Sequence, residues 1–317
     1  MLPVIAQVGP ISVSSFGVFL AIALVASLFV IWRIGRAYDV NEEKLTSLTV
    51  ISFLGGLVGA RILAVGLNLE LFDTYEKVLQ INRYPGLSFW GGLIGGLLTF
   101  WLLSLKNRLN FWSLADFAAA GFILGVAIAD VGCFLGGCGY GVSSDLPIAL
   151  NVVGLVGKRL PISLIEAGLL FLLFRIIWGQ AIRFHYSGYV LASTFIYLGI
   201  VKFISEFFRG DKISLLVISN QLELSVGHII SLLLVLFGVV VIYQRSKRIF
   251  VSDLVSILAY LTSSKKRTTT LLSLKKRWYN LKVSWTIRLG RFNRKTKVVP
   301  RLTMRRLNVK YTPKNFR

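Results

Sequence analysis

Seven long apolar stretches run through the chain up to residue 244, and they constrain the fold more than any other feature. A helix of about 20 mostly apolar residues is what crosses the hydrocarbon core of a bilayer. Hydrophobic residues make up 55% of the 317 residues and charged residues only 16%, and a soluble domain could not bury so many apolar segments. The sequence predicts an all-α, polytopic membrane protein with seven transmembrane helices at 14–36, 45–67, 87–105, 113–134, 161–182, 187–207 and 224–244.

The positions of Lys and Arg predict the orientation of these helices. The loops after the first, third and fifth stretches, with their flanks, carry Arg33, Arg36, Lys44, Lys106, Arg108, Arg175 and Arg183. Basic loops stay on the cytoplasmic side, so we expect the N-terminus outside and the C-terminus in the cytoplasm. The loops around 68–86, 133–160 and 209–223 then share the outer face. No basic region precedes the first stretch, so we expect a retained anchor rather than a cleaved signal peptide.

The C-terminal region differs from the rest in charge. Residues 245–317 hold 21 of the 36 Lys and Arg and only one acidic residue, Asp253, and so carry +20 of the formal net charge of +22. We therefore divide the chain into a transmembrane domain at 1–244 and a basic cytoplasmic tail at 245–317, partly disordered or interfacial. Each cation near an anionic membrane contributes about 1 kcal/mol, and we favour this lipid surface over a nucleic-acid or ribosome contact.

A glycine run, GLSFWGGLIGG at 86–96, opens the third stretch. Its five glycines remove side-chain bulk and let a backbone or a lipid approach closely. Beside Trp90 they predict the mouth of a helix, shaped to admit a ligand. The run lacks the lysine of a phosphate-binding loop, and we expect no cofactor.

Two cysteines, Cys133 and Cys138, lie in GCFLGGCGYG at 132–141. A disulfide between them is possible if the chain turns at the intervening glycines. We favour free thiols, because both residues can still lie in helix or in lipid. The only histidines are His185 and His228, which are too few and too separate to complete a metal site with the cysteines.

Several ionisable residues lie within or at the ends of the apolar stretches: Arg61, Asp116, Asp130, Glu166, Lys202, Glu206 and Arg209. Each costs about 2.5–3.5 kcal/mol at the centre of an inserted helix, so it is usually paired or lines a wet cavity. Glu206 and Arg209, three residues apart, form a salt bridge at the membrane boundary in one interpretation. In the other, Arg61 and Arg209 bind a lipid phosphate, which a planar guanidinium holds with two hydrogen bonds.

Eight motifs occur in the order and topology of the prolipoprotein diacylglyceryl transferases, and the chain resembles this family from about residue 9 to 245. They are GPISVSSFG at 9–17, GAR at 59–61, GLSFWGGLIGG at 86–96, LADF at 114–117, GCFLGGCGYG at 132–141, LPISLIE at 160–166, EFFRGD at 206–211 and SVGH at 225–228. The resemblance implies transfer of diacylglycerol from phosphatidylglycerol to the lipobox cysteine of an exported prolipoprotein, in the bacterial plasma membrane.

The resemblance also assigns roles to individual residues. It places Arg209, Glu166 and Glu206 in catalysis, and Arg61, Gly91, Gly92 and Gly141 at the lipid. Three residues that depart from the family pattern are further candidates: His228 as a base for catalysis, and Trp90 and Asp130 at the lipid. Arg209 would stabilise the departing phosphate, with Arg61 as a second contact to the headgroup. The two glutamates would orient these groups, and the glycines would form closely packed walls.

Some polar positions of the family differ here. Trp90 stands where the family usually has a histidine, and Asp130 replaces an arginine; an indole cannot accept a proton. We hypothesise that Asp130 pairs with Arg61 or Arg209. Two alternatives to an active transferase stay open: a catalytically silent member that binds phospholipid or precursor and recruits a partner through its tail, and a transporter, for which the sequence shows no internal repeat.

Overall fold

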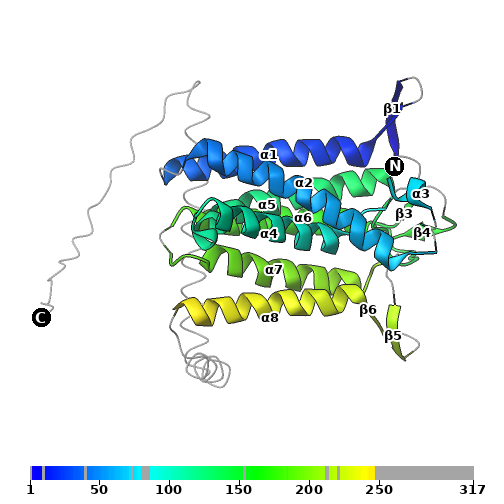
Figure 1. Ribbon diagram of the computed structural model, residues 1–317. Coiled ribbons are helices and arrows are strands. Elements are labelled where there is room, and N and C mark those ends of the chain that lie inside the picture. Colours follow the sequence, from blue (N-terminus) through cyan, green and yellow to red (C-terminus); the bar gives the residue numbers. More distant parts are fainter. Residues whose placement is uncertain are drawn as a thin grey trace, which may run out of the picture. The chain divides into compact units, whose positions relative to one another are not determined.

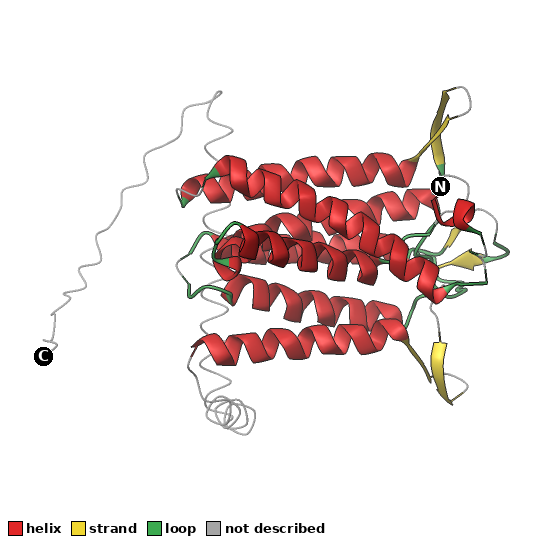
Figure 2. Cartoon of the chain, in the orientation of Figure 1, coloured by secondary structure: helices red, strands yellow, loops and turns green. Residues whose placement is uncertain are grey.

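The computed structural model describes residues 2–8, 11–38, 41–70, 72, 74–79, 86–152, 155–183, 185–210, 214–219 and 222–246. All of them belong to one compact unit, Met1–Arg248. Its long helices run side by side (Figures 1 and 2). From residue 247 on, the predicted tail lies outside the described residues, so the proposed character of 245–317 stays a prediction.

Seven helices are long and apolar enough to cross a membrane, which confirms the predicted fold class. They are α1 (Ser15–Ala37), α2 (Glu42–Leu67), α4 (Phe89–Lys106), α5 (Phe111–Gly136), α6 (Ile162–Ala181), α7 (Tyr189–Glu206) and α8 (Val226–Ser246). Each begins and ends within three residues of its predicted stretch. A short helix, α3 (Tyr75–Leu79), lies between α2 and α4.

Polar residues set helix ends that hydropathy alone does not predict. The helix α2 starts three residues earlier than predicted because the side chain of Asn41 accepts a hydrogen bond from the amide of Lys44 at 2.9 Å. Such a side chain satisfies an otherwise unpaired amide of the first turn. At the start of α7, Asp116 accepts from the amides of Gly188 at 2.7 Å and Leu191 at 2.8 Å. Asp116 therefore caps a neighbouring helix.

Three antiparallel hairpins, which the sequence analysis did not predict, lie at one end of the helices. They are β1 (Val4–Val8) with β2 (Ile11–Ser14), β3 (Leu150–Asn151) with β4 (Lys158–Arg159), and β5 (Ser214–Ser219) with β6 (Leu222–Ser225). Figure 1 shows all three at the same end as α3. We call it the hairpin end. It gathers the loops that we expect on the outer face, although the orientation of the chain in the membrane remains a prediction.

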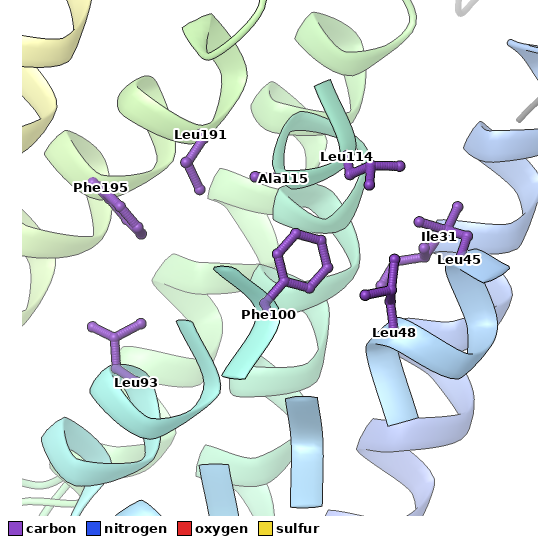
Figure 3. Packing of buried hydrophobic residues seen from close by; sticks show 9 residues of the cluster. All are labelled: Ile31, Leu45, Leu48, Leu93, Phe100, Leu114, Ala115, Leu191 and Phe195. Atoms are coloured by element: carbon purple, nitrogen blue, oxygen red, sulfur yellow. The ribbon is translucent and has the colours of Figure 1, made fainter. Parts of the chain in front are cut away.

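The largest group of buried apolar side chains lies mainly toward the opposite end. It consists of Ile31, Leu45, Leu48, Leu93, Phe100, Leu114, Ala115, Leu191 and Phe195, from five helices (Figure 3). Most of these residues belong to the end of α1 or α4, or to the start of α2, α5 or α7. Among the buried charged residues, Asp116 lies at this opposite end, whereas Arg61, Glu166, Lys202 and Glu206 lie toward the hairpin end.

The glycine run of α4 packs against a second glycine stretch in α2. A Cβ at Gly59 would lie 2.6 Å from the carbonyl oxygen of Gly91 and 2.8 Å from Cα of Gly95. Gly55 and Gly56 meet the same face of α4 one turn earlier in α2. Small residues allow this close backbone contact between membrane helices. We call the contact the glycine seam. It corrects the interpretation of the run as a mouth, because Gly91, Gly92 and Gly95 face α2.

Candidate functional site

Five ionisable side chains come together near the hairpin end: Asp130 of α5, Glu166 of α6, and Lys202, Glu206 and Arg209 in and just after α7. We call them the charge cluster. Glu166 lies four residues into α6 and Lys202 four residues before the last residue of α7. At about 1.5 Å per residue they lie roughly 6 Å inside the helix ends. Arg209 is close enough to interact electrostatically with Asp130, Glu166 and Lys202.

Lys202 is the centre of the cluster. Its ammonium group donates to Glu166 at 2.9 Å and to Asp130 at 3.4 Å, and lies 4.6 Å from the ring centre of Phe89 in α4. Ser205 donates to the second oxygen of Glu166. A buried cation is strongly destabilising without such partners. The hypothesis that Asp130 pairs with Arg61 or Arg209 is therefore corrected, since its ion pair is with Lys202.

Arg209 and His228 are joined by a chain of polar contacts. Nε of Arg209 lies 3.7 Å from Glu206, and the other carboxylate oxygen of Glu206 accepts from Ser225 at 2.7 Å. The hydroxyl of Ser225 is 3.0 Å from Nδ1 of His228, which also accepts from the amide of Ser225 at 3.2 Å. The salt bridge between Glu206 and Arg209, which was one of the two interpretations of these residues, is present. Three of the four residues predicted to be catalytic, Arg209, Glu206 and His228, are therefore connected. The fourth, Glu166, lies in the charge cluster with Glu206 and Arg209.

The backbone of Arg209 is fixed by the loop that follows α5. Arg209 forms an antiparallel bridge with Gly141, and the amide of Gly210 donates to the carbonyl of Tyr140 at 2.9 Å. On its other side Gly141 donates to the carbonyl of Leu160 at 2.8 Å. A Cβ at Gly141 would lie 2.8 Å from that carbonyl oxygen. Gly141 is thus a site of close backbone approach and it supports Arg209, while the contact with lipid predicted for it stays a prediction.

Cys133 and Cys138 form a disulfide, so the expectation of free thiols is wrong. The helix α5 ends at Gly136 and is capped by Gly137 with φ of 82°, a conformation that glycine adopts without strain. This turn brings the two cysteines together, with their Cα atoms 5.0 Å apart. Ser163 of α6 donates to the carbonyl of Gly139 at 2.7 Å. The cross-linked turn therefore also holds the start of α6.

Arg61 lies apart from the charge cluster's ion pairs. Its guanidinium donates to three backbone carbonyls, Lys77 at 2.7 Å, Val78 at 2.9 Å and Gly86 at 3.0 Å. It also lies 4.6 Å from the ring centre of Phe72. These contacts hold the segment between α2 and α4, and the headgroup contact predicted for Arg61 stays a prediction.

Trp90 lies next to a residue that contacts the charge cluster. Its ring packs edge-to-face on Phe89 at 5.1 Å, and Phe89 in turn lies beside the ammonium of Lys202. Lys202 was recognised from the sequence as an ionisable residue of an apolar stretch, but it was not among the predicted site residues. The signal available was its spacing of seven residues from Arg209, which places both on one face of a helix.

Seven apolar helices with buried, paired charges near one end define a multi-pass membrane protein with a polar site at the edge of its membrane-spanning part. Residues 3–244 match the family model described as prolipoprotein diacylglyceryl transferase. The chain belongs to this family.

Individual relatives are similar over 44% to 78% of the chain. The phosphatidylglycerol–prolipoprotein diacylglyceryl transferase of Clostridium tetani is 24% identical over 251 residues, which cover 76% of this chain and 96% of that protein. The enzyme of the same name from Aeromonas hydrophila is 28% identical over 263 residues, covering 78% of this chain and 91% of that protein. A relative of that name from Dehalococcoides mccartyi is 31% identical over 141 residues, which cover 44% of this chain and 53% of that protein.

Proposed function

We propose that this protein transfers diacylglycerol from phosphatidylglycerol to the cysteine thiol of a lipobox in an exported prolipoprotein, in the bacterial plasma membrane. The single observation that carries the proposal is the placement of Arg209. In a chain that matches the transferase family over 3–244, this arginine is fixed at the hairpin end by Glu206 and Gly141. If the hairpin end faces outward, the lipid and the exported prolipoprotein meet at this end of the protein.

The reaction needs a cation beside the departing phosphate. The thiol sulfur forms a bond to the glycerol carbon of the lipid, the bond from that carbon to the phosphate oxygen breaks, and glycerol phosphate leaves with the electron pair. A guanidinium placed in advance stabilises the charge that develops on this oxygen. Arg209 fits this role better than Lys202, because 26% of its side chain is exposed against 5% for Lys202.

The carboxylates and His228 orient these cations. Glu206 is held by Ser225 and lies against Arg209, while Glu166 accepts from Lys202 and Ser205. His228 completes the chain by accepting from Ser225. Gly141 sets the position of the Arg209 backbone. Contact of Trp90 with the lipid belongs to the proposal, as does attraction of the basic tail to an anionic membrane. Gly91 and Gly92 face α2 and Arg61 holds the segment before α4, so these three residues support the site without touching the lipid.

The proposal is tested with purified full-length protein, phosphatidylglycerol vesicles and a lipobox peptide, with the thioether product measured by mass spectrometry. We expect product with the native chain and a loss of about 10²–10³-fold with Arg209→Ala, the range for removal of one stabilising donor. Arg36→Ala is the matched control, because Arg36 is exposed in the last turn of α1, at the opposite end. Bound lipid without product would contradict the proposal and favour a silent member of the family.

A further inference from the structure

The charge cluster holds three carboxylates for two cations. Asp130, Glu166 and Glu206 face Lys202 and Arg209 through the ion pairs described above. The negative charge of an anionic lipid disfavours the charged form of a surplus carboxylate nearby. Such a carboxylate is a better proton acceptor than one that is paired with a cation. The substrate thiol offers a proton, because the thiolate and not the thiol is the nucleophile.

Two of the three carboxylates are already engaged through both oxygens. Glu166 accepts from Lys202 at 2.9 Å on one oxygen and from Ser205 on the other. Glu206 accepts from Ser225 at 2.7 Å and lies 3.7 Å from Arg209. A carboxylate whose lone pairs are satisfied by charged and hydroxyl donors is a weak proton acceptor.

Asp130 is held differently. Its only hydrogen bond within the described part of the chain is the longer one, 3.4 Å from Lys202 to Oδ2, so Oδ1 accepts none there. Its side chain is also the most exposed of the three carboxylates, at 15% against 3% for Glu166 and 10% for Glu206. Asp130 therefore combines an oxygen without a donor among the described residues with the largest exposed fraction of the three carboxylates.

Other acceptors near this end are less suited. His228 is 1% exposed, and its Nδ1 already accepts from the amide of Ser225. Cys133 and Cys138 are joined to each other, so neither offers a thiolate. From these observations, and resting on the proposed function, we propose that Asp130 is the general base that deprotonates the substrate thiol, with its carboxylate held by Lys202.

The proton and electron balance of this step is simple. Oδ1 of Asp130 takes the proton of the thiol, and the thiolate displaces the phosphate oxygen from the glycerol carbon. The C–S bond forms as the C–O bond breaks, and the electron pair leaves with the phosphate. Protonated Asp130 then returns its proton to the released phosphate monoester. Protonation removes the surplus negative charge of the cluster at the moment when charge develops beside Arg209.

The test compares two lipobox peptides on each variant, one with cysteine and one with selenocysteine at the acceptor position. A selenol is already ionised at neutral pH and needs no base. We expect Asp130→Asn to reduce transfer to the thiol by about 10²–10⁴-fold, the usual contribution of a general base, and to keep most of the transfer to the selenol. The ratio of the two rates is measured within one preparation, so partial loss of folded protein does not change it.

Two variants serve as references. Asp145→Asn makes the same chemical change at an exposed loop residue, and its ratio should equal that of the native chain. Arg209→Ala should lower both rates alike, because it acts on the leaving group. If Asp130→Asn is not recovered, Asp130→Ala replaces it with the same expected ratio.

The outcomes separate the inference from the proposed function. An unchanged thiol rate in Asp130→Asn, or equal losses on thiol and selenol, would overturn the assignment of Asp130 while leaving the transferase reaction in place. A native chain that forms no thioether with either peptide would overturn the transferase reaction itself, and the assignment of a base with it.

Discussion

The carboxylate of Glu206 lies directly against Gly227 in the first turn of α8, so closely that a Cβ at this position would overlap it. The neighbouring Ser225 donates to the same carboxylate, and Arg209 lies on its other side. The start of α8 thus shapes the surroundings of the arginine at the end of α7. A glycine is required here for space, since its place in a helix needs no unusual backbone angle.

Gly227→Ala should displace the Glu206 carboxylate and with it the guanidinium of Arg209. A misplacement of about 1 Å in a catalytic group can reduce a rate by about 10²-fold, so we expect a fall in kcat of at least tenfold in the thioether assay. Gly168→Ala in α6 is the control, because a Cβ there meets no atom within 4 Å among the described residues. Equal rates for both variants would contradict the role given to Gly227.

Gly59→Ala should destabilise the helical unit by separating α2 from α4. Its Cβ would meet backbone atoms of Gly91 and Gly95, which cannot rotate away, and such overpacking costs about 1–3 kcal/mol. The measurement is the thermal unfolding midpoint in detergent. The Cβ added by Gly66→Ala in the same helix points into open space. This variant should leave the thermal unfolding midpoint unchanged or slightly raised. A Gly59→Ala protein as stable as Gly66→Ala would argue against the seam.

Arg61→Lys distinguishes support of the loop from binding of lipid. A lysine keeps the charge but cannot reach the carbonyls of Lys77, Val78 and Gly86 together, as the guanidinium does. We expect a loss of about 1–3 kcal/mol in unfolding free energy and little change in KM for phosphatidylglycerol. A raised KM with unchanged stability would instead favour the headgroup contact suggested by the sequence.

The predicted orientation is tested by labelling intact cells with a membrane-impermeant maleimide. Asp145→Cys lies in the exposed loop after α5, and Lys106→Cys is exposed at the last residue of α4. We expect label on the first without permeabilisation and on the second only after it. The native cysteines are joined in a disulfide and give no background. The reverse pattern would place the charge cluster on the cytoplasmic side and conflict with an exported substrate.

Hydropathy was enough to locate the seven helices, because each span must satisfy its backbone internally and cover itself with apolar side chains. It could not reveal the hairpins, such as β3 with β4, whose strands are two residues long and carry no periodic signal. The pairing of Lys202 with Asp130 and Glu166 was equally hidden, because it joins three helices that are distant in sequence. The salt bridge of Glu206 with Arg209 was predictable, since it is local to one turn.

The glycine seam limits the routes by which a substrate with two acyl chains can reach the charge cluster. Where Gly59 of α2 and Gly91 of α4 bring their main chains into contact, no hydrocarbon tail fits between the two helices. Opening this gap would require parting the two helix backbones from each other. A lipid that comes from the bilayer must therefore enter between another pair of helices, because α2 and α4 leave no space between them at these glycines.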